Sequence, residues 1–149
     1  MKGNSYIPLP PILAHTKAII NVKNNDDQCF KWAISRAINP TDVHPERKTT
    51  LLRKPADQLD WNGIEFPVAV EERCIRRFEI NNNISVNIFG YEHVIYPLYL
   101  SKHHSTDNIV DLLLISDGDK SHYCCIKKFN RLTRKLKILI ILCTIAAGV

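Results

Sequence analysis

Residues 24–34 read NNDDQCFKWAI, and this stretch begins the best-defined helix of the sequence. Apolar residues then recur at helical spacing, at positions 30, 33, 34, 37 and 38. Either Asp26 or Asp27 can supply the N-cap, and the Asn-Pro pair at 39–40 closes the helix. The pattern therefore predicts a helix with one apolar stripe and places Cys29 in its first turn.

A second stretch, SHYCCI at residues 121–126, predicts a strand that begins near His122. The preceding DGDK at 117–120 is a hairpin signal. The run before the hairpin, IVDLLLI at 109–115, is nearly all apolar, which is typical of a strand covered on both faces. Shorter runs predict further strands at 17–22, 84–89 and 94–100.

The order of these elements predicts an α+β fold. Two more helical stretches lie at 45–59, where Pro55 interrupts the pattern, and at 71–80, with Ile75 and Phe78 directed inward. Helices followed by a mostly antiparallel sheet indicate this class. With 149 residues and 45% hydrophobic residues, the chain suits one globular domain. We expect an extended lead-in at 1–17, the domain at 18–132 and a tail at 133–149 outside the domain.

The net charge of +5 comes from a short segment without acidic residues. Without six basic residues of this segment, 14 of the 20 Lys and Arg residues remain against 15 acidic ones, so the rest carries −1. A basic run can meet the phosphates of nucleic acid, but it is more often a solvated segment. The six residues are Lys127, Lys128, Arg131, Arg134, Lys135 and Lys137.

The apolar end of the chain, ILIILCTIAAGV at 138–149, has twelve residues. A membrane-spanning helix needs about twenty, so we expect no membrane span. A closing strand or helix and a tail-anchor remnant are alternatives, but the abrupt change in composition favours a chain end that is not part of the domain.

The five cysteines are odd in number, contain no CxxC pattern and follow no signal-peptide-like stretch. Reduced thiols and an intracellular location, in the cytoplasm or nucleus, are therefore expected. His103 and His104 invite a metal-site interpretation, but no cysteine or acidic cluster at ligand spacing accompanies them. We expect neither a metal nor a cofactor.

The position of Cys29 suits a nucleophile. Unpaired N–H groups and the helix dipole favour a thiolate in the first turn, and the same N–H groups can hold an oxyanion. The neighbouring acids Asp26 and Asp27 raise the thiol pKa unless a cation offsets them. His122 is the candidate for that cation and for a general base. A buried structural cysteine and an ordinary strand histidine are the alternative interpretation, although this chain order is also that of papain-like proteases.

The stretch DDQCFKWA resembles the Asp-Gly-x-Cys-Leu-Phe-Arg-Ala signature of the ovarian-tumour (OTU) family of deubiquitinating cysteine peptidases. HYCCI is similar to the His-Tyr strand that supplies that family's histidine. The resemblance implies a papain-like α+β fold and cleavage after the C-terminal glycines of ubiquitin or a similar tail.

A closer resemblance covers about residues 5–132. The segments YIPLP, AIINVKNNDDQCFKWAISRAINP, FPVAV, ISVNIFGYE, YPLYLSK, DLLLI and HYCCIKKFNRL look like a module of invertebrate Polinton/Maverick-type transposons and related integrated viruses. In those proteins the module precedes a Cys2His2 zinc finger and a family B DNA polymerase. The resemblance stops near Leu132, which fits the foreign character of the tail.

Carried over by residue, the resemblance implies that Cys29 is the nucleophile and His122 the general base. Asp26 would be the acid three positions before the nucleophile, and Gln28 or a backbone N–H near Cys29 the oxyanion donor. Two positions depart from the OTU pattern. Cys124 stands where the family places an orienting Asn or Asp.

The second departure is Asp27, which replaces the glycine beside the nucleophile. The orienting residue therefore stays open, with Asp26, Asp111 and Asn130 as candidates. Two hypotheses follow. The first is a cysteine peptidase acting on a ubiquitin-like or polyprotein tail. The second is an inactive module of a transposon or viral polymerase protein that binds a protein partner or nucleic acid.

Overall fold

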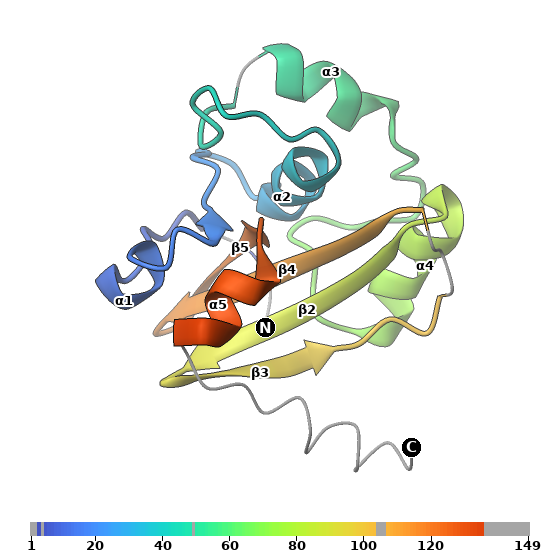
Figure 1. Cartoon of the computed structure of the whole chain (residues 1–149). Coiled ribbons are helices and arrows are strands. Elements are labelled where there is room, and N and C mark those ends of the chain that lie inside the picture. Colours follow the sequence, from blue (N-terminus) through green and yellow to red (C-terminus); the bar gives the residue numbers. More distant parts are fainter. Residues whose placement is uncertain (1–2, 4, 49, 104–106, 136–149) are drawn as a thin grey trace.

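The computed structural model describes residues 3, 5–48, 50–103 and 107–135. The predicted apolar tail at 138–149, with Lys137 before it, lies outside these residues. The chain folds into helices and one sheet in a single α+β arrangement (Figure 1). The elements are α1 (Pro11–Ala14), β1 (Ile19–Ile20), α2 (Cys29–Ile38), α3 (Thr50–Gln58), α4 (Glu72–Asn82), β2 (Ser85–Glu92), β3 (Val94–Tyr99), β4 (Ile109–Asp117), β5 (Lys120–Ile126) and α5 (Phe129–Lys135).

The sheet has five strands in the order β1-β5-β4-β2-β3. The β1–β5, β5–β4 and β2–β3 pairs are antiparallel, whereas β2 and β4 run parallel. The predicted hairpin is confirmed, because Asp117 pairs with Lys120 at its tip. β1 contributes only two residues and pairs with Cys125 and Ile126. The rest of the outer edge of β5, from Lys120 to Cys124, is therefore not covered by β1.

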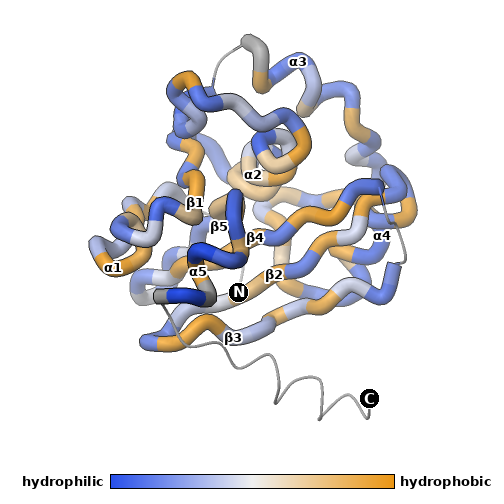
Figure 2. The backbone as a smooth tube through the Cα atoms, in the orientation of Figure 1, coloured by the Kyte–Doolittle hydropathy of each residue, from blue (hydrophilic) through white to orange (hydrophobic). Residues whose placement is uncertain are grey.

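The two faces of the sheet carry separate hydrophobic clusters. Side chains of β2 and β4 with even numbers, such as Leu112 and Leu114, pack with α2 and α4. Their odd-numbered neighbours, such as Leu113, pack with Leu13 of α1 and Leu132 of α5. This division follows from the alternation of side chains along a strand. Figure 2 shows hydrophobic stretches in the strands and in α2, whereas α4 and α5 are mainly hydrophilic.

Helix α2 confirms the predicted stripe and ends at Ile38, as the Asn-Pro signal indicates. Its beginning differs from the expectation. The N-cap is Gln28, without a side-chain capping bond, and neither Asp26 nor Asp27 caps the helix. Asp26 instead accepts a hydrogen bond from the Gln28 N–H at 2.9 Å, which forms a turn before the helix. The acid therefore shapes the loop, and the first helical residue is Cys29.

Three further expectations change in detail. The lead-in contains the short helix α1, so residues 1–17 are not wholly extended. The second helix begins at Thr50, not at position 45, and it contains Pro55. Residues 133–135, assigned to the tail, complete α5. For α1 and α5 tertiary packing accounts for the difference, because Leu13 and Leu132 are fully buried against the sheet.

Replacing Phe30 by Ala should lower the free energy of unfolding by about 3–5 kcal/mol. Its ring is fully buried and packs edge-to-face on Phe78 and Tyr123, at 5.5 and 5.1 Å between centroids. Denaturant unfolding of both proteins measures the difference. Ile80→Ala is the control, because Ile80 is 60% exposed. Equal effects of the two substitutions would contradict the assigned core.

Candidate active site

The thiol of Cys29 lies between the start of α2, the strand β5 and Gly3 near the N-terminus. Its side chain is buried, with 2% exposed. The S–H donates a hydrogen bond to the carbonyl oxygen of Gly3 at 3.2 Å. The sulfur accepts one from the main-chain N–H of Tyr123 at 3.5 Å. Cys29 thus reaches the backbone of β5 immediately after His122.

Burial keeps this thiol protonated, since it raises the pKa of Cys29 to about 11. The backbone amides of Tyr123, Phe30 and Cys29 itself act in the opposite direction, because they point toward the sulfur. The charge of Asp26 adds to the increase. The first turn therefore supplies the expected anion-stabilising N–H groups, but in this closed arrangement burial outweighs them.

His122 is fully buried on the other face of β5. Its Nε2 lies 2.6 Å from Oδ1 of Asn21, which follows β1 in the chain. The Tyr6 ring packs edge-on against the imidazole, with 5.1 Å between centroids. Nδ1 is buried without a hydrogen-bond partner. Burial lowers the pKa of His122 to about 4, and the nearby backbone of Ser5 offsets part of this shift.

The hydrogen bonds of Asn21 define the tautomer of this histidine. The amide Nδ2 of Asn21 donates to the carbonyl oxygen of Ile7 at 2.8 Å, so the amide oxygen faces His122. An amide oxygen can only accept, and Nε2 must therefore carry the proton. The neutral ring then presents the lone pair of Nδ1, which is the form that a general base requires.

The thiol of Cys29 and the imidazole of His122 both lie beside β5, but no hydrogen bond connects them. Cys29 packs in the cluster that contains Tyr123, on the α2 side of the sheet. His122 lies one residue earlier in β5 and projects to the opposite side. Within the described residues, no hydrogen bond links Cys29 Sγ to either ring nitrogen.

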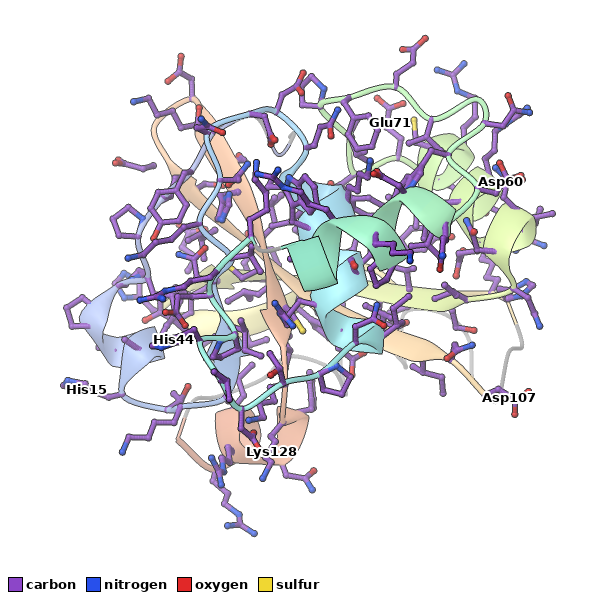
Figure 3. All side chains as sticks on the ribbon, turned by 90° about the horizontal axis from the view of Figure 1, so that it is seen from above. His15, His44, Asp60, Glu71, Asp107 and Lys128 are labelled. Carbon is purple, nitrogen blue, oxygen red and sulfur yellow. The ribbon has the colours of Figure 1, made fainter. Side chains whose placement is uncertain are left out.

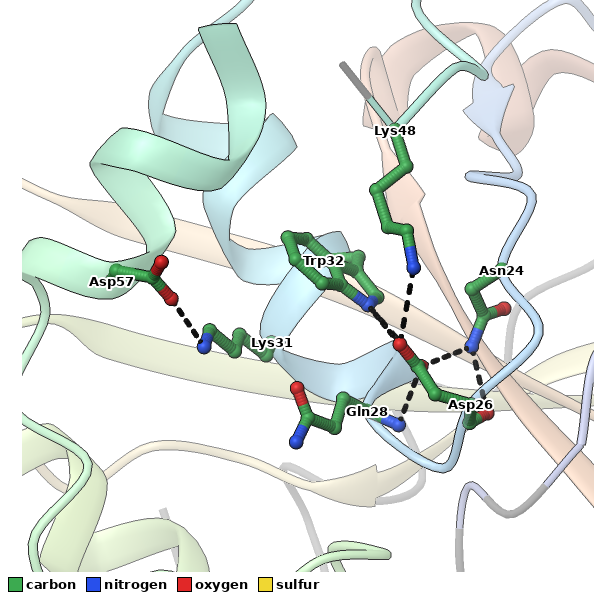
Figure 4. A network of polar contacts seen from close by, with 7 residues as sticks. All are labelled: Asn24, Asp26, Gln28, Lys31, Trp32, Lys48 and Asp57. Carbon is green, nitrogen blue, oxygen red and sulfur yellow. Dashed lines mark hydrogen bonds and ion pairs between the residues drawn. The ribbon is translucent and has the colours of Figure 1, made fainter. Parts of the chain in front are cut away.

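Asp26, expected as a catalytic acid, is the centre of a loop network (Figure 4). Its carboxylate accepts hydrogen bonds from Asn24, the Gln28 N–H, and the indole of Trp32 at 3.2 Å, and it pairs with Lys48 at 3.1 Å. Burial alone would raise its pKa, but these hydrogen bonds dominate and hold the pKa below the usual range. None of these contacts reaches the imidazole of His122.

The other candidates for an orienting residue also lie elsewhere. Asp111 accepts a hydrogen bond from Asn87 at 3.1 Å, four residues along β4 from Ile115, the residue that pairs with His122. Asn130 is an exposed residue of α5. Gln28, expected near the oxyanion, is half-buried, and its backbone N–H is already bonded to Asp26.

Asn21 is the functional candidate that the sequence did not reveal. It follows a two-residue strand that lies about a hundred positions before its partner, and no local pattern connects the two. The only signal is an amide residue, Asn21, next to the end of the predicted strand at 17–22. Its role depends on the β1–β5 pairing, which a single sequence does not specify.

The basic residues that follow β5 lie close to residues 15–18, which precede β1. The backbone N–H groups of Lys127 and Lys128 both donate to the carbonyl oxygen of Ala18. A hollow of about 390 Å³ is lined by His15, Thr16, Lys17, Arg131 and Arg134. The Lys127 ammonium lies 3.4 Å from Asp42. Figure 3 shows His15 and Lys128 at the periphery of the molecule. The side chain of Lys135 is not among the described ones.

Two negative findings apply to the described residues. They contain no group of three or more His, Cys, Asp or Glu side chains placed to hold a metal ion. Every helix in the same ranges is too short or too polar to span a membrane. The class of protein that the fold defines is α+β with a mostly antiparallel sheet. No family model, curated protein or solved structure matches the chain.

The buried neutral histidine should make stability depend on pH. The folded-state pKa of His122 is lowered to about 4, so the unfolded chain binds more protons below its own pKa of about 6.5. Stability is therefore full above pH 6.5 and is lost as the pH falls toward 4. This histidine accounts for at most about 3 kcal/mol of the loss.

Denaturant unfolding between pH 4 and 8 measures this dependence. The His122→Gln variant should show a correspondingly smaller slope over this range. His44→Gln is the matched control, because it removes a histidine that is exposed. An unchanged slope in His122→Gln would show that His122 is not buried as a neutral ring.

Proposed function

We propose that this chain is a papain-like cysteine peptidase with Cys29 as nucleophile, His122 as general base and Asn21 as the residue that orients the base. The observation that carries the proposal is the hydrogen bond between His122 Nε2 and Asn21 Oδ1 at 2.6 Å. It leaves Nδ1 without a hydrogen-bond partner, and the thiol of Cys29 accepts a hydrogen bond from Tyr123, the next residue of β5. Cysteine, histidine and asparagine form the constellation of papain-like proteases.

The helix start supports this assignment independently. The N–H of Tyr123 donates to the sulfur, and the N–H groups of Phe30 and Cys29 also lower its pKa, so all three would stabilise a thiolate. An oxyanion would form on the substrate carbonyl oxygen beside the sulfur, where the same N–H groups are the candidate donors. Because the Gln28 N–H bonds to Asp26, these three groups are better oxyanion candidates than Gln28. The Asp26 network fixes the loop before Cys29, so its role would be to hold the nucleophile in place.

The chemistry requires the two side chains to approach each other. His122 Nδ1 would take the thiol proton while the sulfur attacks the carbonyl carbon of the scissile bond. The imidazolium would then protonate the departing amine, which leaves a thioester. A water molecule activated by His122 would hydrolyse the thioester and restore the thiol. Rotation of the His122 ring toward the outer edge of β5 would supply this contact.

The substrate class rests on sequence resemblance. The stretches around Cys29 and His122 are similar to those of OTU deubiquitinases, so a ubiquitin-like or polyprotein C-terminal tail is the proposed substrate. The presence of Asp27 and Cys124 at positions where that family has other residues distinguishes this chain from typical members. Asn21 would replace the orienting residue that Cys124 cannot provide.

Ubiquitin with an electrophilic C-terminus tests the proposal. We expect a covalent adduct on Cys29 that is absent in Cys29→Ala and forms about a hundredfold more slowly in His122→Gln. Asn21→Ala should slow the reaction roughly tenfold, because the ring loses its preferred tautomer. Cys74→Ala is the matched control, because it removes a different cysteine, which is partly exposed and lies on α4.

Intact-mass spectrometry over time measures the adduct, and circular dichroism verifies the fold of each variant. Equal rates in the wild type and His122→Gln would contradict the assignment of the base. An adduct with a short electrophilic peptide but none with ubiquitin would confirm the peptidase site and exclude ubiquitin as its substrate.

A second candidate function, binding of nucleic acid, is favoured by Lys17. This residue has φ 54°, a left-handed conformation that costs a non-glycine residue about 1 kcal/mol. Its side chain nevertheless lines the hollow with Arg131 and Arg134. Guanidinium groups suit phosphate well, and a basic surface can follow a phosphate backbone. The two functions involve separate surfaces and are compatible.

Charge reversal tests this surface. Lys17→Glu and Arg131→Glu should each weaken binding to a DNA duplex and reduce the slope of log affinity against log salt by about 1. Arg73→Glu is the control, because Arg73 is highly exposed on α4, far along the chain from the hollow. Fluorescence anisotropy at several salt concentrations gives both quantities. Equal effects of all three substitutions would indicate unspecific attraction by net charge.

A further inference from the structure

The N-terminal segment, defined here as Gly3 and Ser5–Ile7, covers the proposed catalytic residues. The Ser5 N–H donates to the Ser121 carbonyl at 3.1 Å, along the edge of β5 that β1 leaves uncovered. The Gly3 N–H donates to the Val68 carbonyl at 3.3 Å on the other side. Main-chain hydrogen bonds to an open strand edge are the usual way in which a sheet holds an extended peptide.

Each catalytic group contacts this segment. The Cys29 thiol donates to the Gly3 carbonyl, and the Tyr6 ring packs on the His122 imidazole. The Asn21 amide donates to the Ile7 carbonyl. Cys29, Asn21 and the distant His122 are thus all contacted by one short stretch of chain.

Gly3 fits this place because it has no side chain. A Cβ atom on Gly3 would lie 2.7 Å from Cys29 Sγ and would also collide with the ring of Tyr123. Tyr123 cannot easily yield, because its hydroxyl donates to the Val68 carbonyl at 2.9 Å and its ring packs against Phe30. The space beside the thiol therefore accommodates a glycine but no larger residue.

We propose that the N-terminal segment occupies the substrate channel of the peptidase in the manner of a bound peptide and inhibits the enzyme from within the same chain. This inference rests on the function proposed above. The segment must leave for a substrate carbonyl to reach Cys29 and for His122 to turn toward it. In the closed form it removes water from both groups and keeps the pair neutral.

Displacement of the segment would change the reactivity of one cysteine only. Water would reach Cys29 and His122, and the burial that opposes their charged forms would decrease. Cys125 is equally buried, but it packs with Ile20, Trp32 and Leu52 in a cluster that contains no residue of the segment, so it would stay protected. The reactivity of Cys125 therefore reports unfolding, whereas that of Cys29 without Cys125 reports opening.

Site-resolved alkylation of the full chain with iodoacetamide, read by mass spectrometry between pH 6 and 9, tests the inference. We expect Cys29 to react slowly in the wild type. In Gly3→Val its rate should rise at least about tenfold, while Cys125 stays unreactive. Ile12→Ala is the matched control, because Ile12 follows the segment and its side chain is 58% exposed.

A synthetic peptide with the sequence of residues 3–9, GNSYIPL, should protect Cys29 of the Gly3→Val variant from alkylation. The same peptide with valine in place of the glycine should not protect it. If Gly3→Val unfolds the protein, as reaction of Cys125 would show, Tyr6→Ala provides the test. That variant removes a half-buried ring and leaves the backbone bonds in place.

Two results would overturn the inference. One is a Cys29 that stays protected in folded Gly3→Val and Tyr6→Ala proteins. The other is a Cys29 that reacts rapidly in the wild type. The proposed function fails separately, if the exposed thiol of Gly3→Val titrates like an ordinary cysteine and His122→Gln does not change its pKa. In that case the segment would bury a thiol that has no catalytic role.

Discussion

The alternation of side chains along β5 is the constraint on which the rest of this structure depends. Tyr123 points to the side of α2 and completes the cluster with Phe30, whereas His122 and Cys124 point to the side of α1 and α5. The strand thereby joins both halves of the core. Its outer edge is not paired with β1 from Lys120 to Cys124, and within this stretch the Tyr123 N–H donates to the thiol of Cys29.

Whether Cys29 and His122 are inert or reactive depends on their access to water. A thiol and an imidazole that are both buried keep their neutral forms, because the separated charges would lose hydration without gaining a direct contact. This explains why the pKa of Cys29 is raised to about 11 while that of His122 is lowered to about 4. The hydrogen bond to Asn21 is already suited to catalysis, since it places the proton on Nε2. Opening the edge of β5 would change the solvation of both groups and give the ring of His122 room to turn toward Cys29.

The Asp26 network and the N-terminal segment hold the two sides of the thiol. Asp26 ties the loop before α2 to Trp32 and Lys48, so Cys29 starts its helix from a fixed position. Gly3 closes the other side with its carbonyl contact to the thiol and one main-chain hydrogen bond to Val68. The loop is held by charge-assisted bonds, whereas the segment has few of them. Opening is therefore expected to occur at the segment, where fewer interactions must break.

The sequence by itself determined the elements whose signals are local. The apolar stripe of α2, the DGDK turn and the all-apolar β4 each follow from a few adjacent residues, and the α+β class follows from their order. It also selected Cys29 and His122 as a pair worth testing. It gave Asp26 a catalytic role because spacing alone cannot show where a carboxylate points. Only the tertiary structure decided that Asn21 meets His122, that the lead-in folds over both, and that β2 runs parallel to β4. These contacts join residues up to 101 positions apart, and no short-range preference of the chain encodes which distant backbone groups will pair.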